Sequence, residues 1–294
     1  MMYKPYGVLA SLVTPFDKDG GIKEKALREH IAWVADAGVH GIGVGPNTGE
    51  FVNLTFDDIK KLTDIAVDAA KGRVPVTIGA LSASLRANIE ILKYAKEAGA
   101  DSVLVQAPYY LPISMDKLVD YFKALGNVGI PMIIFNHPYK TPYNLQPSFY
   151  EKLLDIKTFV GVKEVDMNMG NNARRTAFFK EAKISYLMGE EYMTFYHYLH
   201  GGDGCYPALV NIVPDLCVGL YDACKKGDVT TAEKIHMDML SLGEAVYVEN
   251  YPSGLKEAME MIGRDGGVTR EPVGRLTKES REKVRLVLQK LGRL

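Results

Sequence analysis

The stretch VPVTIGALSASLRANIEILKYAKEAGADSVLVQAP, residues 74–108, contains two short apolar runs separated by a longer segment with helical spacing. Residues 74–80 and 102–108 are rich in Val, Leu and Ile, which is typical of strands buried on both faces. Residues 84–98 place apolar side chains at intervals of three and four, and Gly99 follows them as a helix C-terminus. The stretch therefore predicts a strand–helix–strand unit with parallel strands.

The same alternation continues on both sides of this unit. The apolar segments that read as buried strands number eight: Gly7–Pro15, Gly41–Gly45, Val74–Ala80, Ser102–Pro108, Ile130–Pro138, Phe159–Val165, Ile184–Gly189 and Gly204–Ala208. Helical patterns lie between them, among others at Lys23–Ala37, Phe56–Lys71, Ser84–Ala98, Met115–Leu125 and Pro147–Leu154. Eight such units predict an α/β protein of the (β/α)8 TIM-barrel type.

The strand signal stops after about residue 214. Helical patterns then follow at Leu216–Lys225, Thr231–Glu249, Gly254–Ile262 and Lys278–Leu291. We expect a catalytic barrel in residues 1–214 and a C-terminal helical region packed on it in residues 215–294. The alternative, an open doubly wound sheet, is less favoured because Gly41–Pro46 lacks the third glycine of a dinucleotide-binding loop.

Composition excludes several classes of partner. The 294 residues carry 35 Lys and Arg against 36 Asp and Glu, so no basic excess is present to bind nucleic acid or an anionic membrane. No apolar run is long enough to span a bilayer, and the N-terminus does not resemble a signal peptide. The three cysteines cannot form a disulfide framework, which is typical of a reducing compartment. We expect a cytoplasmic enzyme.

In barrels of this type the active site lies at the C-terminal ends of the strands. Lys163 occupies such a position, and strand alternation places it on the face opposite Val162 and on the same face as Gly161. We expect Lys163 to point into the barrel, with Gly161 leaving room for its stem. Burial lowers the pKa of a lysine toward the neutral amine, which attacks ketones and forms a Schiff base. The alternative is that the Lys163 side chain bends to solvent or pairs with Glu164. If Lys163 is considered without its neighbours, this alternative is favoured.

Several segments together resemble the dihydrodipicolinate synthase/N-acetylneuraminate lyase family. They are Val13-Thr14-Pro15-Phe16, Pro46-Asn47-Thr48-Gly49-Glu50, Tyr109-Tyr110, Gly161-Val162-Lys163-Glu164, Gly201-Gly202-Asp203-Gly204 and Tyr251-Pro252-Ser253-Gly254-Leu255-Lys256. The resemblance implies a TIM barrel with C-terminal helices, a Schiff-base lysine and no metal or organic cofactor. It also implies a small 2-oxo acid such as pyruvate as the ligand, and a homo-oligomer, dimer or tetramer.

The resemblance also assigns roles to individual residues. Lys163 matches the Schiff-base lysine, and Thr48 and Gly49 match the turn that holds the carboxylate of the 2-oxo acid. Tyr110 matches a tyrosine that reaches across a dimer interface into the neighbour's proton relay. Gly189 and Tyr206 fall near positions that line the substrate pocket.

Three departures from the family pattern concern proton transfer and substrate choice. Phe135 stands where most catalytic members have an acid/base tyrosine, and Asn47 replaces the hydroxyl residue of the relay. Lys140 replaces the arginine that binds the second substrate of the synthases, so a bidentate fork becomes a point charge. His137, two residues from Phe135 and so on the same strand face, is a candidate substitute acid/base. Tyr139 and Tyr143 are near enough in sequence to compete with it.

These residues favour a Schiff-base lyase that cleaves, condenses or dehydrates a 2-oxo acid. Asn47 and Lys140 suit a substrate with several hydroxyls, which favours a 2-keto-3-deoxy sugar acid aldolase or dehydratase. The alternatives are dihydrodipicolinate synthase proper, or a barrel that binds 2-oxo acids without turnover. No metal site is predicted: His197 and His200 lack a third ligand, and we expect them on a partly exposed helix face.

Overall fold

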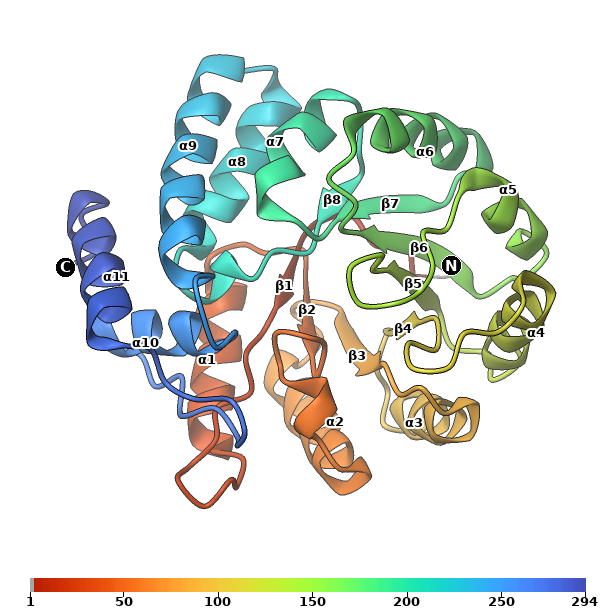
Figure 1. The fold of residues 1–294 in the computed structure, drawn as a ribbon, viewed down its shortest axis with the longest axis horizontal. Helices are drawn as coiled ribbons and strands as arrows, with labels where there is room; N and C mark the ends of the chain where they lie inside the picture. Colours follow the sequence, from red (N-terminus) through yellow and green to blue (C-terminus); the bar gives the residue numbers. More distant parts are fainter. Residues whose placement is uncertain (1–2) are drawn as a thin grey trace.

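The computed structural model describes residues 3–294, in which eight parallel strands close into a barrel (Figure 1). The strands pair in sequence order, and the eighth returns to pair with the first. Their bounds are β1 Gly7–Ser11, β2 Gly41–Val44, β3 Val76–Ala80, β4 Ser102–Gln106, β5 Met132–Asn136, β6 Phe159–Glu164, β7 Ser185–Met188 and β8 Gly204–Cys205. Each strand lies within one of the eight predicted segments, so the (β/α)8 fold is confirmed.

Helices separate the strands and surround them on the outside (Figure 1). Their bounds are α1 Glu24–Asp36, α2 Phe56–Ala70, α3 Leu85–Glu97, α4 Met115–Gly126, α5 Pro147–Tyr150, α6 Met169–Ala182, α7 Glu191–Leu199 and α8 Pro214–Lys226. Short polar side chains begin several of them: Thr55, Ser84 and Ser114 each accept a hydrogen bond from the backbone N–H three residues on. The predicted helix 147–154 is divided, because α5 continues as the 3-10 turn η2, Glu151–Leu153.

The last strand is shorter than its sequence pattern predicts. The expected segment was Gly204–Ala208, whereas β8 ends at Cys205. Pro207 has no backbone N–H with which to continue a ladder, and the chain turns into the 3-10 helix η3, Leu209–Asn211. Beyond the strand the backbone still bonds to both neighbours: Tyr206 donates its N–H to the Met188 carbonyl at 2.6 Å, and the Pro207 carbonyl accepts from the Ser11 N–H at 3.1 Å.

Three further helices follow the barrel: α9 Val229–Val246, α10 Ser253–Met261 and α11 Lys278–Lys290. They lie along one side of the barrel, next to α8 and α1 (Figure 1). Helix α8 contacts β1 and α7 and is thus the outer helix of the eighth unit. The predicted C-terminal region, residues 215–294, thus contains almost all of α8, because an amphipathic sequence does not reveal which surface its apolar face covers.

A buried ion pair joins the C-terminal helices to the barrel. Lys256 on α10 lies 2.6 Å from the Glu50 carboxylate, and both side chains are almost completely buried. The same ammonium donates hydrogen bonds to the carbonyl oxygens of Thr14 and Val268, each at 2.7 Å. All three N–H donors of Lys256 are thus used, and the residue fixes the turn that precedes η1, Phe51–Asn53.

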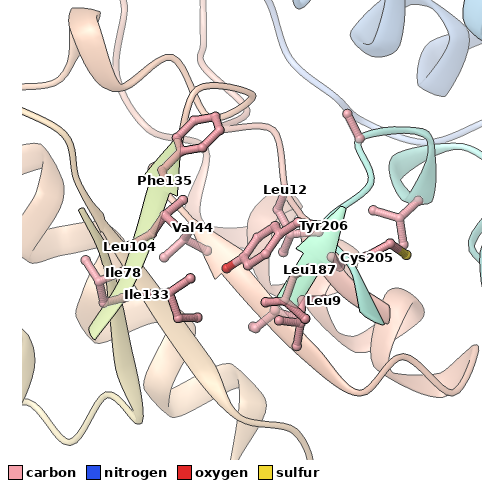
Figure 2. Packing of buried hydrophobic residues seen from close by; sticks show 14 of the residues in the cluster. Leu9, Leu12, Val44, Ile78, Leu104, Ile133, Phe135, Leu187, Cys205 and Tyr206 are labelled. Atoms are coloured by element: carbon pink, nitrogen blue, oxygen red, sulfur yellow. The ribbon is translucent and has the colours of Figure 1, made fainter. Parts of the chain in front are cut away.

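Buried hydrophobic side chains from strands around the whole barrel pack together (Figure 2). Tyr206 lies across the barrel interior with its oxygen pointing toward the opposite strands (Figure 2). A Cβ atom at Gly43 would come within 2.4 Å of that oxygen, so β2 requires glycine at this position. The filled core closes the barrel below Phe135, which stands at the C-terminal end of β5 (Figure 2).

Candidate active site

Lys163 points into the barrel, as the strand alternation predicts. Its side chain is buried, and its ammonium nitrogen lies 4.4 Å from the ring centroid of Phe135 and 4.8 Å from that of Tyr206. The expectation about Gly161 is wrong, because a Cβ there would meet Pro5 and Ser185 instead.

The glycine that makes room for Lys163 is Gly189, at the end of β7. A Cβ at Gly189 would lie 2.5 Å from the Cε atom of Lys163. Register explains the difference, since β6 and β7 pair with Glu164 opposite Met188, and Gly189 donates its N–H to the Glu164 carbonyl at 2.7 Å. The residue that approaches the Lys163 side chain is therefore Gly189, just after the neighbouring strand β7, and not Gly161 on the same strand.

Burial lowers the pKa of Lys163 to about 8, against the opposing charges of Glu191 and Glu190. The two aromatic faces stabilise the charged form by cation–π contact but offer it no hydrogen bond. About a tenth of the amine is therefore neutral at pH 7, and this is the form that attacks a carbonyl carbon.

The ammonium opens into a cavity of about 350 Å³ at the C-terminal end of the strands. Seven of the predicted site residues line it: Asn47, Thr48, His137, Lys140, Lys163, Gly189 and Tyr206. Gly49 and Tyr110 are the two that do not. The structure thus brings together residues that lie up to 159 positions apart in the sequence, counting from Asn47 to Tyr206.

Hydrogen bonds to two other hydroxyl groups fix the position of the Thr48 side chain. The Thr48 hydroxyl accepts a hydrogen bond from Ser11 at 2.9 Å and shares another with the Tyr251 hydroxyl at 2.8 Å. Gly49 is packed closely, because a Cβ there would lie 3.0 Å from the backbone nitrogen of Gly45. Within residues 3–294, neither the Thr48 N–H nor the Gly49 N–H donates to another protein group. Two buried donors without a protein partner suit a carboxylate.

His137 lies in the cavity with its ring against Phe135, at a centroid distance of 4.9 Å. Burial, followed by the positive charges of Lys163 and Lys140, lowers the pKa of His137 to about 4. The imidazole is therefore neutral at pH 7, and within residues 3–294 its Nδ1 atom has no hydrogen-bond partner. A neutral ring of this kind accepts protons poorly and does not act as an imidazolium acid.

Neither tyrosine considered as a competitor of His137 lines the cavity. The Tyr143 hydroxyl donates to the Ile113 carbonyl at 3.0 Å and accepts from the Ile113 N–H at 2.6 Å. Tyr139 is more than half exposed, and its hydroxyl accepts a hydrogen bond from the Met167 N–H. Neither hydroxyl therefore lies in the cavity that holds the Lys163 amine.

Tyr110 lies outside the cavity and is 82% exposed. It borders a second, apolar groove of about 660 Å³ together with Leu85, Leu111 and Ile113. Leu111 is also exposed, at 70%. Within one chain Tyr110 does not contact Lys163, and the role implied by the resemblance needs a second chain.

Sequence reasoning missed five titratable residues of the cavity wall. They are Glu190, Glu191, Tyr192, Tyr247 and Tyr251. The two glutamates follow β7 directly, so the strand-end rule could have found them. The tyrosines at 247 and 251 come from the segment between α9 and α10, which no strand-end rule covers.

The two glutamates have different surroundings. Glu191 accepts hydrogen bonds from the backbone N–H groups of Ala208 and Leu209 and from the Tyr247 hydroxyl, at 2.5, 3.0 and 2.9 Å. No side chain within residues 3–294 hydrogen-bonds to the carboxyl of Glu190. Burial, followed by the charge of Glu191, raises the pKa of Glu190 to about 7. Glu191 therefore holds the cavity wall, while Glu190 is free to interact with a ligand.

Two negative findings apply to residues 3–294. This part of the chain has no group of three or more His, Cys, Asp or Glu side chains placed to hold a metal ion. Across the same residues, no helix has both the length and the apolarity needed to cross a membrane.

The expectation of an exposed histidine face is wrong for His197, which is buried with its Nε2 atom 3.0 Å from the Tyr186 carbonyl oxygen.

Residues 4–291 match the dihydrodipicolinate synthetase family. The chain is 35% identical to the 4-hydroxy-tetrahydrodipicolinate synthase of Afipia carboxidovorans, over 98% of this chain and 97% of that protein. Its fold matches that of a prophage protein of the same family from E. coli K12 in complex with pyruvate, with TM-score 0.94 and 28% identity over 98% of this chain and 99% of that one. It also matches the first monomeric dihydrodipicolinate synthase variant, with TM-score 0.94 and 27% identity over 99% of this chain and 98% of that one. The chain belongs to the dihydrodipicolinate synthetase family, whose members are class I Schiff-base lyases acting on small pyruvate-type molecules.

Proposed function

We propose that Lys163 forms a Schiff base with a 2-oxo acid, whose carboxylate is bound by the backbone N–H groups of Thr48 and Gly49. The observation that carries the proposal is the buried amine of Lys163, with its lowered pKa, in one cavity with that turn. The iminium that forms withdraws electrons from the neighbouring carbon, so a carbon–carbon or carbon–oxygen bond next to it can break.

The substrate is a 2-keto-3-deoxy sugar acid, which the enzyme cleaves as an aldolase or dehydrates. The cavity offers Asn47, Lys140 and Glu190 as partners for hydroxyl groups along such a chain. Dihydrodipicolinate synthesis is the second candidate, favoured by the names of the relatives. Phe135 argues against dihydrodipicolinate synthesis, because phenylalanine at that position lacks the hydroxyl group of the usual proton relay.

The first experiment traps the intermediate. Incubation with pyruvate followed by borohydride is expected to add one reduced pyruvyl group, which peptide mass spectrometry places on Lys163. Lys157, an exposed lysine just before β6, serves as the internal control and stays unmodified. Absence of an adduct with pyruvate and with a panel of 2-keto-3-deoxy acids contradicts the proposal and leaves a binding protein without turnover.

The panel of sugar acids also separates the two reactions. An aldolase releases pyruvate, which a coupled dehydrogenase assay detects. A dehydratase consumes the same substrate and releases water without pyruvate. Substrate loss with no pyruvate therefore identifies dehydration.

The cytoplasmic location stays a prediction from the cysteine content.

We further infer that the chain assembles into at least a dimer through the groove at Tyr110 and Leu111. Exposed apolar side chains of this size favour burial against a partner. Sedimentation velocity is expected to show a dimer or tetramer, and Leu111→Lys to shift it toward monomer. Val229→Lys, which charges another exposed apolar position at the start of α9, leaves the assembly unchanged. A fully active monomer contradicts this inference.

A further inference from the structure

The cavity lacks the hydroxyl that would normally move protons during Schiff-base formation. Phe135 occupies one side of the Lys163 amine and has no exchangeable proton. Tyr206 occupies another side, but its oxygen points away into the barrel interior, toward Gly43. The amine is therefore enclosed by two aromatic faces, and the proton carrier has to come from another wall.

The remaining tyrosine hydroxyls of the cavity are either hydrogen-bonded to other groups or weak acids. Tyr251 is hydrogen-bonded to Thr48, and Tyr247 donates to Glu191. Burial and the nearby carboxylates, Glu190 first, raise the pKa of Tyr192, which makes its hydroxyl a weaker acid. His137 is neutral and borders two cations, which oppose the addition of a further proton.

We propose that Glu190 carries the protons of Schiff-base formation in place of the missing tyrosine hydroxyl. This role rests on the proposed function, because it presupposes that Lys163 attacks a 2-oxo acid. The carboxyl lines the same cavity as the amine, and it belongs to the residue directly after Gly189, which contacts the Lys163 stem. It has no side-chain partner within residues 3–294 that would hold it away from a ligand.

Its environment suits a group that both gives and takes a proton. Burial and the adjacent Glu191 raise the pKa of Glu190 to about 7, while the N–H groups at the start of α7 and Lys163 keep it from rising further. Protonated and ionised forms therefore coexist near neutral pH, as an efficient general acid/base requires. The other titratable groups of the cavity are Lys163, His137, Lys140, Glu191, Tyr192, Tyr206, Tyr247 and Tyr251.

The proton steps balance with this single carboxyl. The lone pair of the neutral Lys163 amine attacks the carbonyl carbon, and the C–O π electrons move to oxygen. Protonated Glu190 gives its proton to that oxygen, and the resulting carboxylate removes one proton from the attached nitrogen. It then returns this proton to the hydroxyl, which leaves as water while the nitrogen lone pair forms the C=N bond. The products are an iminium, water and ionised Glu190.

The test measures how fast the adduct forms. Protein is mixed with pyruvate, quenched with borohydride at successive times, and weighed by intact mass spectrometry. Glu190→Gln keeps the size of the side chain but cannot supply a proton, so the rate is expected to fall by about 100-fold or more. Adduct in Glu190→Ala is expected to form faster as acetate is added, because acetate can occupy the vacated space and carry the proton.

Two matched variants test the competing groups of the same cavity. His137→Asn and Tyr192→Phe are expected to form the adduct within a few-fold of the parent rate. An unchanged rate in Glu190→Gln overturns the role of Glu190, and so does a large loss in either control without one in Glu190→Gln. A parent protein that forms no adduct contradicts the proposed function itself, which is a different result from equal rates.

Discussion

Lys163→Met is expected to lose the borohydride adduct and all measurable turnover, yet to unfold with a higher free energy than the parent. Methionine fills a similar volume between Phe135 and Tyr206 but has no nucleophilic nitrogen. Removal of a covalent nucleophile costs on the order of 10⁴-fold or more in turnover. Catalysis and stability therefore change in opposite directions.

The gain in stability follows from the lowered pKa of Lys163, about 8 against an ordinary value of 10.5. One pKa unit corresponds to about 1.4 kcal/mol, so keeping this amine charged in the folded chain costs roughly 3 kcal/mol at pH 7. Lost cation–π contacts offset part of this, which leaves an expected gain of about 1–3 kcal/mol for the methionine variant.

The stability difference between the parent and Lys163→Met is also expected to depend on pH. Between about pH 8 and 10.5 the unfolded chain holds the Lys163 proton and the folded chain does not, so the parent gains stability as pH rises. The difference between parent and Lys163→Met is therefore expected to shrink across that window in denaturant titrations. Lys157→Met changes an exposed lysine and should show no such trend. A constant difference from pH 7 to 10.5 contradicts the argument.

Lys256→Met is expected to lower the free energy of unfolding by about 3–5 kcal/mol, the usual effect of removing one partner of a buried ion pair. The Glu50 carboxylate would stay buried without its cation, and the carbonyl oxygens of Thr14 and Val268 would lose a donor. Urea unfolding of the purified protein measures the loss.

Two variants separate the buried charge from the lost packing. Glu50→Gln in the Lys256→Met background removes the unpaired charge and is expected to recover a large part of the loss. Lys23→Met breaks an ion pair with Asp265 at the surface and is expected to cost less than about 1 kcal/mol. Equal losses in Lys256→Met and Lys23→Met would show that burial of the pair has no energetic importance.

Several residues of the candidate active site could be predicted because they lie at the ends of strands. Lys163, Asn47 and His137 each lie where a buried strand runs out, and strands of one barrel direct these ends to the same face. The resemblance of several segments to one family supplied Thr48, Gly189 and the expected ligand. Glu190 obeys the same rule and was overlooked, although it directly follows Gly189.

The sequence by itself determined the barrel, because the alternation of apolar runs and helical periods from residue 74 to 108 recurs along the chain and only parallel β/α units satisfy it. It also predicted that Lys163 faces inward, because side chains alternate along a strand and several segments together resemble one family. Tertiary structure alone decided which glycine admits the lysine stem, since Gly189 approaches it through the register of β6 and β7. It alone placed Tyr251 behind Thr48, 203 residues away, and brought Glu190 into the same cavity as the amine. Local patterns fix which face a side chain takes, but distances and partners depend on how distant elements pack.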